Sequence, residues 1–244
     1  AAFMLWGQRG YIEYLLRTPN RALRDRHLPA LLSGRFAGAS GLSNAMKSLA
    51  GLEKLQIRAR TDGDAFLLSG KLPWVTNLRP GGFHVAAAVE REDGGPAFVA
   101  FLTDADAGLS RSADLETMGM RSSDTAALSF DSVRIDESRI LAANAELWLT
   151  QLKPSFIALQ CGLSIGLARR ALGEAASRAS AGRSVLEGAV DAARARLSQA
   201  ETRLVSGLRQ QRFEGDAALL FALRIEFAGI VADAPKGKSV AEQT

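Results

Sequence analysis

The chain has 244 residues and a mass of 26.0 kDa, enough for one large domain or two smaller ones with a buried core. Hydrophobic residues make up 47% and charged residues 23%, which excludes a disordered or collagen-like chain. The net charge is +4, but no block of five like charges occurs, so no nucleic-acid partner is expected. One cysteine excludes a disulfide scaffold and favours a cytoplasmic location, and with two histidines it leaves no metal-ligand cluster.

No membrane span and no signal peptide are predicted. The longest apolar tract, residues 217–234, contains Arg224 and Glu226, which are costly to place in hydrocarbon. The chain opens without methionine inside a predicted helix, and we expect both of its ends to be cut.

Residues 1–35 are predicted to be a helical segment. Leucine and isoleucine recur there near helical spacing, Pro19-Asn20 interrupts the pattern, and Ser33-Gly34 ends it.

Residues 36–141 are predicted to form a central β domain. Short apolar or alternating segments at 66–68, 83–89, 97–102 and 127–135 are separated by turns rich in glycine, proline, aspartate and serine. Because no helices separate these strands, we expect an antiparallel sandwich or barrel rather than a Rossmann unit, and no dinucleotide-binding glycine motif is present.

One of these strands is expected to bury a single face and to kink. The apolar side chains of this strand can all point to the same face of the sheet only if the strand is irregular near Asp131-Ser132. These side chains are Leu128, Phe130, Val133 and Ile135.

Residues 142–244 are predicted to form an up-down helix bundle. The segment is rich in alanine, and helices are expected near 148–180, 188–212 and 215–234. One helix carries a stripe of apolar residues three or four apart, made of Val190, Ala193, Leu197, Ala200, Leu204 and Leu208. We expect Leu197, Leu204 and Leu208 to need the surface of a partner.

The segment 71–77 is the first candidate binding site. Trp74 followed by Thr76 and Asn77 offers a flat apolar surface beside hydrogen-bonding groups, which suits a planar heteroaromatic ligand. A core tryptophan beside a turn is the alternative. Cys161 lies in an apolar run and is expected to be a buried, inert thiol, and neither histidine lies in a catalytic motif.

Three segments together resemble the acyl-CoA dehydrogenase family: residues 71–77, residues 118–125 with the strand that follows, and the helix pair entered at Lys153-Pro154 and left at residues 178–183. Gly70 and residues 74–77 match the family pattern Gly-x-Lys-x-Trp-Ile-Thr-Asn, with the lysine moved to Lys71. Residues 118–125 match Met-Gly-x-Arg-x-Ser-Asp-Thr, and residues 33–43 are similar to the segment that leads into the family's Leu-Thr-Glu-Pro. The resemblance covers nearly the whole chain in the family's order.

The resemblance implies an N-terminal helical domain, a central β-barrel-like domain and a C-terminal four-helix bundle. On this reading, residues 1–35 are the end of the first domain, 36–141 the middle domain and 142–244 an incomplete bundle. The implied cofactor is FAD, held between the last two domains. The implied reaction is α,β-dehydrogenation of an acyl-CoA thioester, with an electron-transfer flavoprotein as acceptor and a homo- or hetero-oligomer formed through the bundle.

The resemblance also implies roles for individual residues. Trp74 would back the isoalloxazine ring, with Val75 beside it in the same motif, and Thr76 would hydrogen-bond near flavin N5. Ser43 would bond the polar edge of the ring, and Arg178 would reach an FAD phosphate across the dimer. Lys153 matches an arginine near the substrate site.

The departures from the family pattern leave the catalytic residue unknown. Residues 43–50 replace Thr-Glu-Pro-x-Ala-Gly-Ser-Asp and lose its glycine. One family position for the catalytic base lies beyond the chain and the other is Leu152, while Asp124 is expected to be a turn residue. Two alternatives therefore remain: an inactive or flavin-poor subunit of a heteromeric dehydrogenase, and a flavin monooxygenase on the same fold.

Overall fold

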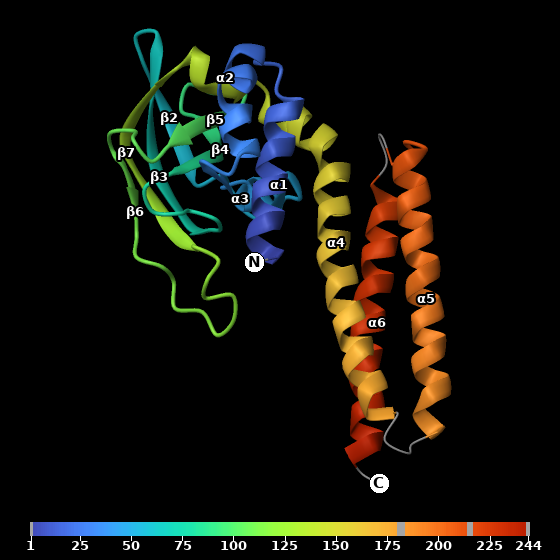
Figure 1. Cartoon of the computed structure of the whole chain (residues 1–244). Helices are drawn as coiled ribbons and strands as arrows, with labels where there is room; N and C mark the ends of the chain where they lie inside the picture. Colours follow the sequence, from blue (N-terminus) through green and yellow to red (C-terminus); the bar gives the residue numbers. More distant parts are fainter. Residues whose placement is uncertain (1, 180–183, 214–216, 243–244) are drawn as a thin grey trace. The chain divides into compact units, whose positions relative to one another are not determined.

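The computed structural model describes residues 2–179, 184–213 and 217–242, and the chain divides into two compact units, Ala1–Leu152 and Lys153–Thr244 (Figure 1). Each unit is an independent cluster of contacts and has its own core. The chain is α+β, with six α-helices and a mixed eight-stranded sheet in the described part. Domain boundaries at residues 35 and 141 stay a prediction.

The first unit combines three helices with the sheet. Its helices are α1 (Ala2–Arg17), α2 (Arg21–Leu32) and α3 (Ser43–Leu49), with the first turns of α4 (Ala145–Ala179) and a 3-10 turn at Glu137–Arg139. Its strands are β1 (Ala37–Ser40), β2 (Ile57–Asp62), β3 (Ala65–Val75), β4 (Phe83–Arg91), β5 (Phe98–Thr103), β6 (Leu109–Arg111), β7 (Ala126–Asp136) and β8 (Ile140–Ala142).

The sheet is mixed, so the expectation of a purely antiparallel domain was wrong. Its strand order is β6-β7-β3-β2-β4-β5-β8, with β1 pairing to β4 outside this path. Both β1 and β2 run parallel to β4, β1 along residues 83–86 and β2 along residues 89–91. Helix α3 lies between these two strands in the chain, and it was not expected because the sequence at 43–49 shows no apolar repeat long enough to mark a helix.

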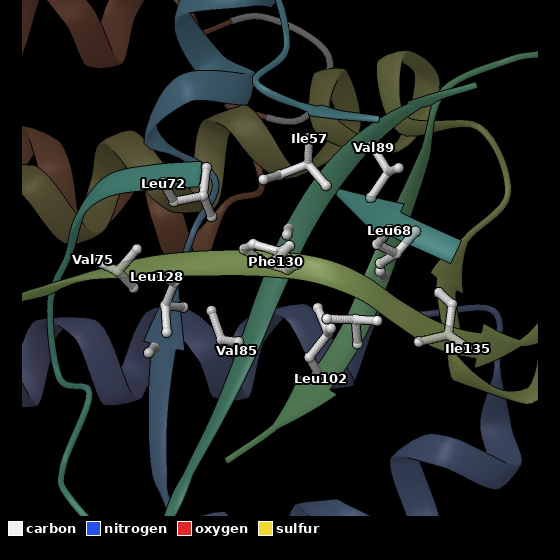
Figure 2. Close-up of a cluster of buried hydrophobic side chains, with 14 of the residues drawn as sticks. Ile57, Leu68, Leu72, Val75, Val85, Val89, Leu102, Leu128, Phe130 and Ile135 are labelled. Atoms are coloured by element: carbon white, nitrogen blue, oxygen red, sulfur yellow. The ribbon is translucent and has the colours of Figure 1, made fainter. Parts of the chain in front are cut away.

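One core cluster lies on one face of the sheet and is made of residues that alternate along the strands (Figure 2). On β4, Val85 and Val89 belong to this cluster, whereas Ala86 and Ala88 point to the other face and pack with the helices. Because both faces of β4 are covered, its sequence is apolar at consecutive positions rather than at alternate ones.

The second face of β4 and β5 packs against α1, α2, α3 and the first turns of α4. Tyr14 and Trp148 anchor this layer, with ring centroids 5.8 Å apart in an edge-on arrangement. The Tyr14 hydroxyl is 2.7 Å from the Ser40 hydroxyl, and Trp148 Nε1 donates to the main-chain oxygen of Arg17 over 3.1 Å. The start of α4 is thereby fixed to α1, and α1 to β1.

Strand β7 confirms the predicted buried face and its kink. Its apolar residues at 128, 130, 133 and 135 are all buried, and Ser132 between them has a φ of +52°. The pairing with β3 shifts register between Leu68 and Gly70. Gly70 is required there, because a Cβ at its φ of +140° would lie 2.2 Å from the Gln56 oxygen.

The second unit contains the rest of α4 with α5 (Ser184–Arg209) and α6 (Ala218–Glu242). Helix α6 continues past Pro235, so the expected end at residue 234 was wrong. Leu197 and Leu204 pack inside the unit's own core with Phe227, which corrects the expectation that they need a partner, whereas Leu208 is 46% exposed.

Candidate functional site

Trp74 lies near the end of β3 and is exposed, which rules out the alternative of a core tryptophan. Its side chain is 63% exposed, whereas Val75 beside it is fully buried among the core residues of Figure 2. Thr76, the next residue, is partly exposed. The strand therefore ends in an aromatic face and a hydroxyl that are both open to a ligand, while Val75 could offer a ligand only its main chain.

Three hydroxyl groups form a chain behind this surface. Thr76 Oγ1 is 3.0 Å from Thr125 Oγ1, which is 2.7 Å from the buried Ser123 Oγ. Each hydroxyl can donate one hydrogen bond and accept others, so the chain holds the Thr76 oxygen in place and leaves its hydroxyl able to donate to a ligand when Thr125 donates to it. Asp124, with a φ of +48°, accepts from Leu78 N–H through its main chain, as expected of a turn residue.

Ser43 begins helix α3 and its side chain is exposed. Two residues earlier, Gly41 donates to the Ala86 oxygen over 2.9 Å, and a Cβ at Gly41 would lie 2.7 Å from Leu72 Cδ1. Leu72 precedes Trp74 by two residues in β3, so Gly41, two residues before Ser43, lies close to the strand that carries Trp74.

Residues 43–49 form a short helix where the family pattern has a glycine-containing segment. Asn44 secures the return of the chain to β2, because its amide donates to the Lys54 oxygen over 2.9 Å and accepts from Gln56 N–H over 3.0 Å. The segment that departs from the family pattern is therefore ordered, and hydrogen bonds of Asn44 hold it in place.

A pocket of about 240 Å³ lies beside α3 in the first unit. It is lined by Ala45, Ser48, Leu49, Leu55, Ala88, Ala97, Ala145, Glu146 and Leu149. Its walls combine small apolar side chains with a hydroxyl at Ser48 and a carboxylate at Glu146, so a slim group with an apolar part fits it. Sequence reasoning missed the pocket because small residues from distant segments form it, and isolated alanines give no signal.

The remaining predicted site residues belong to the second unit. Lys153 Nζ lies 5.5 Å from the centroid of the Phe221 ring, a cation–π contact. Arg178 falls in the last turn of α4, but its side chain lies outside the described residues. Leu152, at one family position for the catalytic base, is 1% exposed and cannot accept a proton.

The residues at the end of β3 fit a flavin. An exposed indole face suits a planar ring, and the fixed Thr76 hydroxyl suits a ring nitrogen or carbonyl oxygen. Among the described residues no group of three or more histidine, cysteine, aspartate or glutamate side chains could hold a metal ion. No helix in the described part combines the length and apolar character that crossing a membrane requires.

The cysteine and the buried histidine lie outside this surface. Burial raises the pKa of Cys161, whose thiol faces the Leu220 oxygen at 3.8 Å, which agrees with an inert thiol. Burial also lowers the pKa of His84 to about 4, so its imidazole is neutral near pH 7.

Known proteins related to this chain in sequence or in fold include acyl-CoA dehydrogenases. A mitochondrial isovaleryl-CoA dehydrogenase from Pongo abelii is 29% identical over 136 residues, which is 53% of this chain and 31% of that protein. The chain thus spans about a third of the length of this relative. No family model matches the sequence.

The solved structures that share the fold include two dehydrogenases. Butyryl-CoA dehydrogenase from Megasphaera elsdenii matches with a TM-score of 0.73 at 17% identity, over 99% of this chain and 66% of that one. A glutaryl-CoA dehydrogenase from Mycobacterium smegmatis in complex with FADH2 matches with a TM-score of 0.76 at 18% identity, over 96% of this chain and 64% of that one. This chain therefore resembles acyl-CoA dehydrogenases in sequence over about half of its length, and it shares their fold.

Proposed function

We propose that this chain is part of an FAD-dependent oxidoreductase that dehydrogenates an acyl-CoA thioester between its α and β carbons. The observation that carries the proposal is the exposure of Trp74 beside the fixed hydroxyl of Thr76. A large aromatic side chain that stays 63% exposed on a rigid strand end is typical of a binding surface, because burial of its face would otherwise stabilise the fold.

The residues of the site would divide the binding of FAD among them. Trp74 packs against the flavin ring, Thr76 donates a hydrogen bond to the ring's polar edge, and Ser43 supplies a second hydroxyl. Arg178 of a second subunit holds an FAD phosphate through a charge-assisted hydrogen bond. When bound, the flavin supplies the acceptor for the hydride that leaves the β carbon.

The substrate side of the proposal rests on the pocket beside α3 and on Lys153. The apolar walls of the pocket suit a slim aliphatic segment, and a lysine suits the negative charges of an acyl-CoA. None of the residues named above is the carboxylate that removes the α-proton, because the side chain of Leu152 cannot accept a proton. In this proposal another residue supplies that carboxylate.

A second candidate function is a partner subunit that binds little or no flavin and completes the site of another chain. Two observations favour it: the buried Leu152 at a base position and the helix at residues 43–49 in place of the glycine-containing segment. The flavin monooxygenase alternative needs no carboxylate base at residue 152, so Leu152 does not count against it.

An absorption spectrum of the purified protein separates these functions. Bands near about 370 and 450 nm after loading with FAD are expected for the dehydrogenase, and their bleaching by an acyl-CoA without oxygen would identify the substrate class. Absence of bands after loading with FAD and removal of the unbound FAD would contradict the dehydrogenase and favour the partner subunit. Bound flavin that an acyl-CoA fails to bleach, but that consumes oxygen after reduction, would favour the monooxygenase.

We further propose an oligomer formed through the helical unit, an electron-transfer flavoprotein as acceptor and a cytoplasmic location. Exposed apolar side chains on α5 and α6, namely Leu208, Leu219, Phe221 and Ile225, support association. Light scattering at micromolar concentration is expected to give more than a monomer, and a strictly monomeric protein would contradict the oligomer.

A further inference from the structure

Two amide side chains close the free edge of β1 at Gly38. The Gly38 N–H donates to Gln8 Oε1 over 2.6 Å, and Asn77 Nδ2 donates to the Gly38 oxygen over 3.0 Å. Strand β1 pairs with β4 along its other edge, so these two groups of Gly38 point away from the sheet. The side chains of Gln8 and Asn77 thus take the place that a neighbouring strand would fill, because main-chain groups at a buried edge need partners.

Gln8 uses its whole hydrogen-bonding capacity in this arrangement. Its Oε1 accepts from Gly38 and, over 3.0 Å, from Asn77 Nδ2. Its Nε2 donates to the main-chain oxygens of Leu31 over 2.9 Å and Phe36 over 3.1 Å. An amide with four partners has one orientation. Gln8 therefore links α1 to the end of α2, to the start of β1 and to Asn77.

Asn77 is held from a second side as well. Its N–H donates to the Ser123 oxygen over 3.0 Å, its side chain is buried, and its φ of +66° lies in the left-handed region that asparagine tolerates. Residues 76–78 are therefore held between the Gln8–Gly38 contacts and the turn at 123–125. Gly38 permits the close approach of α1, because a Cβ there would lie 2.6 Å from Tyr11 Cβ.

We propose that Gln8 and Asn77 are positioning residues that set the Trp74/Thr76 surface in its ligand-binding arrangement before the ligand arrives. The inference rests on the proposed flavin site, since it explains how a strand end that leaves Trp74 exposed stays ordered. Interactions that fix a binding surface in advance improve affinity because less conformational entropy is lost on binding.

The test compares Gln8→Leu and Asn77→Asp with the control Gln56→Leu. Leucine keeps volume but removes all four hydrogen bonds of Gln8. Aspartate tolerates the left-handed backbone but cannot donate to Gln8 or Gly38. Gln56 is an exposed glutamine of the same unit whose side chain makes one 3.4 Å contact with Glu53, so its loss should change nothing.

Two measurements are made on each folded variant. Amide hydrogen exchange without ligand is expected to quicken at residues 76–78 in Gln8→Leu and Asn77→Asp but not in the β4–β5 pair. Flavin titration, followed by quenching of flavin fluorescence, is expected to show affinity at least tenfold weaker. Unchanged exchange at 76–78 would overturn the positioning role whether or not flavin binds, whereas a wild type that binds no flavin would overturn the proposed function itself.

A third variant separates positioning from general destabilisation. In Gln8→Glu the charged carboxylate faces the oxygens of Leu31 and Phe36 without a proton to donate, whereas the protonated acid can donate to one of them. We expect the ratio of flavin affinities, Gln8→Glu over wild type, to rise toward one as pH falls from 8 to 5. A ratio that stays constant or worsens over this range would contradict the proposal.

Discussion

The ring of Phe36 stacks on the imidazole of His84, with their centroids 4.5 Å apart and their planes within 17°. His27 meets the same imidazole edge-on at 5.1 Å, and Phe101 approaches it at 5.1 Å from β5. His84 is 2% exposed, and its Nδ1 has no hydrogen-bond partner among the described residues. The fold thus uses this histidine as a neutral aromatic ring.

Stability is therefore expected to fall as pH drops from about 6.5 toward 4. Burial, with smaller contributions from His27 and Arg139 and opposed by Asp106, lowers the pKa of His84 to about 4. The unfolded chain binds the proton near pH 6.5, so the free energy of unfolding falls by up to about 1.4 kcal/mol per pH unit below that value and is unaffected above it. Burial also lowers the pKa of His27, which adds to the loss.

Urea unfolding between pH 5 and 7.5 measures this slope, above the range in which carboxylates titrate. The variant His84→Phe keeps the stack on Phe36 and removes the titrating group, so its stability should depend less on pH than that of the wild type. Equal slopes for the two proteins would show that His84 does not titrate as described.

Replacing Trp74 with alanine is expected to abolish flavin binding while leaving the fold nearly intact. Because the side chain is 63% exposed, the loss of unfolding free energy should stay below about 1 kcal/mol. The contrast is Trp148→Ala, which removes a 5% exposed tryptophan and its hydrogen bond to Arg17 and should cost about 3–5 kcal/mol. Thermal unfolding and flavin titration of both variants decide, and a Trp74→Ala protein that still binds flavin fully would refute the assignment.

Truncation of Leu68 tests the core of the sheet. Leu68 is fully buried in the cluster of Figure 2, so Leu68→Ala should lower the free energy of unfolding by about 2–5 kcal/mol. Leu52, 76% exposed, is the matched control and should change stability by less than about 0.5 kcal/mol. Similar values for the two variants in urea unfolding would mean that this cluster does not stabilise the unit.

Arg178 tests whether the helical unit takes part in cofactor binding. If it contacts an FAD phosphate, Arg178→Ala should weaken FAD affinity by about 1.5–3 kcal/mol, roughly ten- to a hundredfold. Lysine should restore only part of the affinity, because it lacks the planar fork of arginine. If Arg178 only complements the dipole of α4, it contributes about 0.3–1 kcal/mol to the helix, and all three proteins would bind FAD equally.

The sequence predicted the features whose signals are local. The alternation in β7 and the apolar stripe at Val190, Leu197 and Leu204 each follow from the geometry of one element, and all of these residues are buried. The exposure of Trp74 could not be predicted in this way. A tryptophan in an apolar stretch of sequence is equally consistent with a core position. Whether other segments cover Trp74 depends on the tertiary structure around β3, which the sequence does not reveal.

The missed features depend on contacts between distant segments. The parallel pairing of β1 and β2 with β4 is decided by the path of the chain through α3, and that helix is too short for a periodic signal. The bonds of Gln8 join residues 28, 30 and 69 positions apart in the chain. A polar residue on a predicted helix gives no indication of such partners.

Strands β1 and β2 share one edge of β4, and each is registered to β4 by its own pairs. A change in the segment between them therefore leaves both registers untouched, because neither strand takes its alignment from the other. An insertion or a deletion at the exposed positions 50–52 of this segment is expected to change the connection between the two strands without changing their pairing with β4. This architecture gives evolution a place where the sequence between two strands can change, as it has in the helix at Ser43–Leu49, while the pairing of both strands with β4 is kept.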